Sequence, residues 1–105
     1  MAYLNLQERE ALLRELTTMN FNQAKGKLRR MDAKGKLAFL RNAQAGGEFH
    51  TRFDLYGLGT VVTLIEREVS DKQIANDKPG AAPIRLKPEF RLDEVIVQPM
   101  PENRT

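Results

Sequence analysis

The chain has 105 residues, of which 41% are hydrophobic and 30% are charged, and its formal net charge is +3. This composition is typical of a single globular domain that can bury a modest core. The chain contains no cysteine, which excludes both a disulfide framework and a zinc site built from thiolates.

Two helices are predicted at the start of the chain, over residues 6–18 and 20–31. Asn5 with Glu8, and Asn20 with Gln23, have the spacing of residues that cap the first turn of a helix. Behind each cap, apolar residues recur at helical spacing, in steps of three, four and three in the second segment, with charged residues off the apolar side. Both segments are therefore predicted to be amphipathic helices.

The pentapeptide Ala-Lys-Gly-Lys-Leu occurs twice, at residues 24–28 and 33–37. Nine residues advance a helix by about 900°, half a turn beyond whole turns, so Leu28 and Leu37 would point in opposite directions on one straight helix. We therefore predict a break, with Asp32 as the N-cap of a third helix over residues 33–44. Gly46 and Gly47 would end that helix, since glycine tolerates positive φ.

The hydrophobic period changes to two from Glu48 onward, which predicts strands. Strands over residues 48–55 and 60–69 are predicted to form a hairpin through a turn at 56–59, and the second strand, apolar on both faces, is expected to be central. A further strand begins at residue 84, and residues 95–97 continue it or form a short fourth strand. Pro88 predicts that this strand lies at an edge or carries a bulge.

Helices followed by strands predict an α+β fold, with two or three N-terminal helices packed on a three- to four-stranded antiparallel sheet. We expect one domain over residues 1–98, with a helical part at 5–45 and a sheet part at 48–98. Residues 70–83 have the composition of a mobile loop, and residues 99–105 that of a disordered tail.

Positive charge is concentrated in residues 18–44, which contain seven cations and a single acid, Asp32. Cations at this density can neutralise phosphates, and this electrostatic attraction supplies most of the affinity in non-specific binding to nucleic acids. An ordinary solvated helix face remains an alternative explanation. The candidate nucleic-acid-binding residues are Lys25, Lys27, Arg29, Arg30, Lys34, Lys36 and Arg41.

Other candidate sites are weaker. His50, the single histidine, is expected to share a strand face with Arg52 and Asp54, and these three side chains could support acid–base chemistry. An ordinary solvent-exposed strand face explains the pattern as well, so no catalytic residue is assigned. No motif predicts a metal site or a cofactor. Met19, Met31 and Phe39 could contact a partner, although core packing is the favoured interpretation.

The leading functional hypothesis is a small non-enzymatic module that binds RNA or DNA backbone through the basic segment. The alternative is a protein–protein adaptor or regulator that binds an acidic protein or pairs through an exposed sheet edge. A hydrolase centred on His50 is a third, weaker hypothesis. The sequence lacks a signal-peptide pattern and an apolar run long enough to cross a bilayer, so we expect a cytoplasmic protein, monomeric or homodimeric, without a membrane partner.

Overall fold

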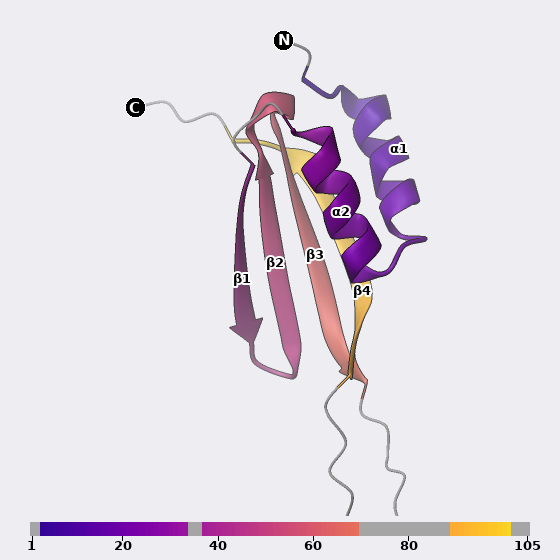
Figure 1. Ribbon diagram of the computed structural model, residues 1–105, viewed down its shortest axis with the longest axis vertical. Coiled ribbons are helices and arrows are strands. Elements are labelled where there is room, and N and C mark those ends of the chain that lie inside the picture. Colours follow the sequence, from indigo (N-terminus) through magenta and orange to yellow (C-terminus); the bar gives the residue numbers. More distant parts are fainter. Residues whose placement is uncertain (1–2, 34–36, 70–88, 102–105) are drawn as a thin grey trace, which may run out of the picture.

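A computed structural model describes residues 3–33, 37–69 and 89–101 (Figure 1). Two N-terminal helices pack against a four-stranded antiparallel sheet, which confirms the predicted α+β class. The elements are α1 (Leu6–Leu16), α2 (Phe21–Met31), β1 (Ala38–Gln44), β2 (Glu48–Leu55), a 3-10 turn η1 (Tyr56–Leu58), β3 (Thr60–Val69) and β4 (Glu89–Pro99).

Both predicted helix caps are present. Glu8 N donates to Asn5 Oδ1 at 2.8 Å and Asn5 N donates to Glu8 Oε1 at 2.9 Å. The same reciprocal pair joins Asn20 and Gln23 at the start of α2, at 2.9 and 3.0 Å. These bonds satisfy backbone N–H groups that have no partner inside the helix, and so they fix where each helix begins.

The strands follow one another across the sheet in the order β1-β2-β3-β4, and every neighbouring pair is antiparallel. The helices lie on one face of the sheet, over β3 and β4 in Figure 1, with α1 packed against β4. The core fills the space between the helices and this face. It is made of Leu12, Leu16, Ala24, Leu28, Phe53, Leu55, Val62, Leu64 and Val95.

The predicted third helix over residues 33–44 is wrong. Residues 38–44 form β1, which pairs with β2 in a register that places Phe39 opposite Phe53 and Gln44 opposite Glu48. Gly46 and Gly47 form the turn of this hairpin, with φ of +84° and +76°, which is why glycine is needed there. The helical part therefore ends at Met31, well short of the predicted boundary at residue 45.

Asp32 does not cap a following helix, as predicted, but ends α2. Its buried carboxylate accepts a hydrogen bond from Gly57 N in η1, with Oδ1 at 3.2 Å. This bond ties the end of α2 to the connection between β2 and β3. The partner lies 25 residues away in the chain, so a local capping rule could not identify it.

The remaining strand predictions are confirmed in their main features. β3 is a central strand, and β4 lies at the edge with a register shift opposite Ile65 and Glu66. Pro99 is the last residue of β4, and Met100 N donates to Gly59 O at 2.9 Å, so the tail predicted from residue 99 starts too early. The predicted loop at 70–83, Pro88 and residues 102–105 lie outside the described residues.

None of the described helices is long and apolar enough to span a bilayer.

Candidate nucleic-acid interface

One side of α2 faces away from the core, and the helical period identifies its residues. Ala24 and Leu28 are fully buried, and Gly26 lies two residues from each, about 200° around the helix from both. The outward side of α2 is therefore centred near Gly26. Arg29 and Arg30 are exposed on this side, while Lys25 and Lys27 flank it.

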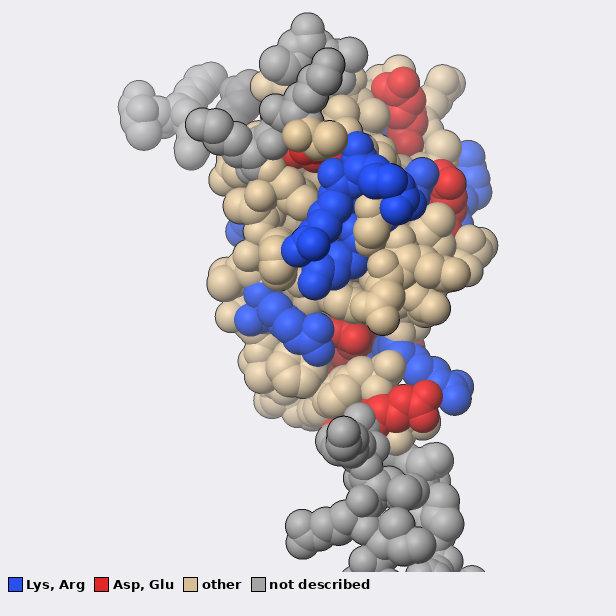
Figure 2. Space-filling view, in the orientation of Figure 1, with Lys and Arg blue, Asp and Glu red and all other residues tan. Residues whose placement is uncertain are grey.

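Three cations of α2 carry charge that the described acidic residues do not neutralise. Lys27 Nζ lies 3.1 Å from Glu15 Oε2 of α1, and this ion pair accounts for its charge. Within the described ranges, Lys25, Arg29 and Arg30 form no ion pair; we call these three the outer cations. Figure 2 shows Lys and Arg side chains gathered in one patch over α2.

Gly26 puts no side chain of its own in the middle of this patch, where it is half-buried beneath the Arg30 side chain. A Cβ atom at this position would come no closer than 3.5 Å to Arg30 Nη1, so packing within the chain does not require glycine here. Glycine in a helix interior is about 1 kcal/mol less favourable than alanine. A glycine at this place would let the backbone of a partner approach α2 closely.

An exposed aromatic ring borders the patch and was not identified as a site residue from the sequence. Phe39 of β1 is 45% exposed, whereas core packing was predicted for it. Lys25 Nζ lies 5.1 Å and Arg29 Cζ 5.6 Å from the centroid of its ring. Met19 and Met31, by contrast, are partly buried and pack against the core.

Arg41, a predicted site residue, differs from the outer cations because it is paired with a buried acid. Its Nη1 lies 3.0 Å from Oε1 of the buried Glu66, and its guanidinium lies over the rings of Phe49 and Phe21, with Cζ at 4.4 and 5.4 Å from their centroids. The local partner and the two rings give Arg41 a structural role. The other two predicted residues, Lys34 and Lys36, lie outside the described residues.

His50 belongs to a chain of charged groups on the sheet face opposite the helices. Its Nε2 lies 2.9 Å from Glu48 Oε1, Glu48 Oε2 lies 2.6 Å from Arg67 Nη1, and Arg67 Nε lies 3.1 Å from Asp93 Oδ2. Arg52 and Asp54 pair separately, at 2.8 Å. The arrangement therefore joins three strands, and His50 is engaged with Glu48 rather than with the two residues predicted beside it.

The carboxyl of Glu48 should make stability depend on pH. The hydrogen bond from His50 is the main reason that the pKa of Glu48 lies below its usual value; burial opposes this effect, and the charge of Arg67 adds to it. A lowered folded-state pKa means that Glu48 stabilises the fold above the ordinary glutamate pKa and loses this effect as pH falls through the folded value. We expect Glu48→Gln to lower the urea midpoint at neutral pH, and the difference from the parent to shrink under acid conditions.

The matched control is Glu10→Gln on α1, since Glu10 has no ion pair among the described residues. This variant should track the parent at every pH. A constant difference between Glu48→Gln and the parent down to strongly acid pH would contradict the assignment.

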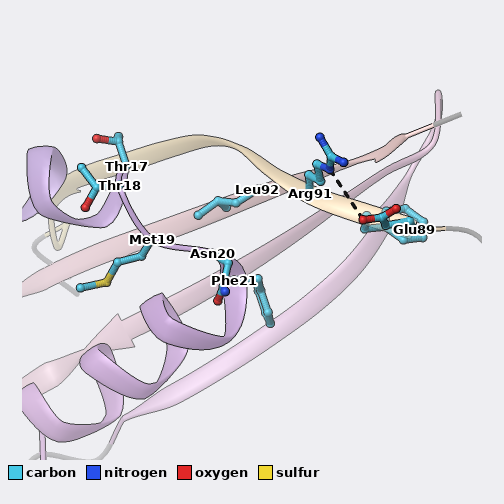
Figure 3. Close-up of a pocket in the computed structure, with 9 residues that line it drawn as sticks. Thr17, Thr18, Met19, Asn20, Phe21, Glu89, Arg91 and Leu92 are labelled. Carbon is cyan, nitrogen blue, oxygen red and sulfur yellow. Dashed lines mark ion pairs between the residues drawn. The ribbon is translucent and has the colours of Figure 1, made fainter. Parts of the chain in front are cut away.

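A second surface feature is a pocket of about 490 Å³ between the α1–α2 turn and the start of β4 (Figure 3). Residues 17–21 and 89–92 line it. Among its described lining residues the single cation, Arg91, is 3.7 Å from Glu89, so these residues offer an anion no unbalanced charge. Among the described residues, no group of three or more His, Cys, Asp or Glu side chains could hold a metal ion.

Comparison of the chain with known protein families, with curated proteins and with solved structures found no match.

Proposed function

We propose that this protein is a non-enzymatic binding module that docks nucleic-acid backbone through the outward side of α2. The observation that carries the proposal is the set of outer cations, which lie on one helix side without acidic partners among the described residues. Gly26 at the centre of that side supports a close approach by a partner. Contacts of this kind position a backbone and do not read sequence.

The test replaces all three outer cations with alanine and measures binding to labelled RNA and DNA by fluorescence anisotropy over a series of salt concentrations. Each phosphate contact contributes about 0.7 to 0.9 to the slope of log K against log salt concentration. We expect the variant to bind at least about tenfold more weakly at low salt and to lose about 2 to 3 from the slope.

A matched control removes the same charge elsewhere, by changing Arg14, Arg52 and Arg91 to alanine. Arg14 lies in the last turn of α1, and the other two lie on strands β2 and β4. This control should keep most of the parent's slope. If it loses as much as the outer-cation variant, net charge alone governs binding and α2 is not the interface.

A protein partner is the second candidate, and the exposed edge of the sheet supports it. All seven residues of β1 are exposed, and the pairing of this strand within the described residues is with β2 alone. An extended segment of another protein could add to such an edge. A stoichiometric complex that survives nuclease treatment and the loss of the outer cations would favour this function over the first.

A further inference from the structure

Phe39 has the position of a stacking platform beside the outer cations. It stands opposite Phe53 in the β1–β2 register, and the two rings are stacked with centroids 5.6 Å apart and an interplanar angle of 22°. Phe53 is fully buried. One face of an exposed ring is thus supported by the core, which fixes the orientation of the ring before any ligand arrives.

The cations above this ring are the same ones that carry the proposed backbone contact. Lys25 and Arg29 reach over Phe39 from α2, although β1 lies beside the helices and not beneath them in Figure 1. Both side chains are long and can rotate, and the ring is still 45% exposed. A planar group of a ligand could displace the Lys25 and Arg29 side chains from the face of the Phe39 ring. The two displaced cations would then lie next to that group.

These features fit unpaired bases better than a duplex. In a duplex the faces of the bases are covered by their neighbours, so an aromatic side chain can stack on them only after a base leaves the helix. Proteins that bind single strands without sequence preference combine cations along the backbone with aromatic rings under the bases. Phe39 with Lys25 and Arg29 supplies both groups at one place.

We propose that the partner is single-stranded nucleic acid, with one base stacked on Phe39 and its flanking phosphates held by the outer cations. This inference rests on the proposed function and narrows its ligand. Because stacking is insensitive to base identity, little sequence preference is expected.

The test uses the absence of tryptophan from the chain. Phe39→Trp introduces a single indole at the platform, and the probes are a short oligouridine, a short oligothymidine and a DNA duplex of the same length. We expect saturable quenching of the indole emission by both single strands and none by the duplex. The control is Leu6→Trp on α1, at a position that is 61% exposed, which should show no quenching with any probe.

A second measurement compares affinities. Phe39→Leu keeps an apolar side chain but removes the stacking surface, so single-strand binding should weaken about five- to a hundredfold. The slope of the salt dependence should stay close to that of the parent, since no cation is lost. Thermal melting of each variant verifies that it is folded.

The outcomes separate this inference from the function on which it rests. Two results would overturn the stacking site while the backbone interface stands. In the first, single strands bind through the outer cations without quenching the indole of Phe39→Trp. In the second, the duplex binds as tightly as the single strands do, and Phe39→Leu binds like the parent. If changing the outer cations leaves binding of every probe intact, the interface itself is wrong.

Discussion

Arg41→Met is expected to destabilise the protein by about 2–4 kcal/mol, because it leaves the carboxylate of Glu66 buried without an opposite charge. Removing one partner of a fully buried pair typically costs about 3–5 kcal/mol. The Arg41 side chain is 38% exposed and that of Glu66 only 7%, so water can reach part of the pair and the expected loss is smaller. Methionine keeps an apolar stem against the Phe49 ring.

The geometry of this pair makes the effect specific to charge. Glu66 Oε1 is buried and has no aligned hydrogen-bond donor in the described part of the chain, although Arg41 Nη1 lies 3.0 Å away. The carboxylate is therefore stabilised by the nearby positive charge more than by a directed bond. Thr51 Oγ1, on the strand between them, is likewise buried without a partner, so among the described residues it makes no hydrogen bond to the Glu66 carboxylate.

A second variant distinguishes charge from packing. Arg41→Met combined with Glu66→Leu removes both charges, and replacing a buried pair with apolar residues of similar size is often close to neutral. The double variant should recover most of the lost stability in urea unfolding. Arg52→Ala is the comparison for an exposed pair, with an expected loss of about 1 kcal/mol or less. A single Arg41→Met variant as stable as Arg52→Ala would refute the structural role of Arg41.

The parts of the fold that the sequence predicted correctly rest on local signals. Asn5 and Asn20 each satisfy a backbone group three residues ahead, so the starts of α1 and α2 can be identified without knowing anything else about the chain. In the same way, alternation along 48–55 separates the two faces of β2, and the β-branched residues of 60–69 mark β3 as a strand. A two-residue period needs no distant partner to be recognised.

The error over residues 33–44 arose because a helical and an extended pattern coincide there. Ala33, Leu37 and Leu40 share a helical face, but in the extended chain Phe39 faces the helix side of the sheet and Leu40 the other. No β-branched residue in 38–44 marks a strand. The choice is made by pairing with β2 across the hairpin turn, which the pattern within 38–44 does not reveal. The glycines at 46–47 suit either a helix end or a hairpin turn.

The same mistake explains why the candidate site was only partly foreseen. Treating residues 33–44 as helical placed Arg41 with the cations of α2, whereas the strand places it beside Glu66, two strands away. It also gave no reason to place Phe39, named only as a possible partner contact, beside Lys25 and Arg29 of α2. The excess of positive charge could be counted from the sequence, but its division into outer cations and a structural arginine required the strand register.

Phe53→Ala is expected to cause the largest loss of stability, about 3–5 kcal/mol, because it empties a fully buried position where β2 meets the helix layer. Domains of this size are stable by only about 5–15 kcal/mol, so the variant should unfold at a much lower urea concentration. Circular dichroism during urea titration measures the change.

Phe39→Ala is the natural comparison, since both variants remove one ring of the same stacked pair. Phe39 is 45% exposed, whereas Phe53 is fully buried, so Phe39→Ala returns less apolar area to water than Phe53→Ala. The expected loss is about 1–2 kcal/mol, including the ring–ring contact. Equal losses for the two variants would show that Phe39 belongs to the core. A small loss at Phe39 would mean instead that the stability of the fold does not require an aromatic ring at this exposed position beside Lys25 and Arg29. Weaker nucleic-acid binding by Phe39 variants could then be assigned to the missing ring rather than to unfolding.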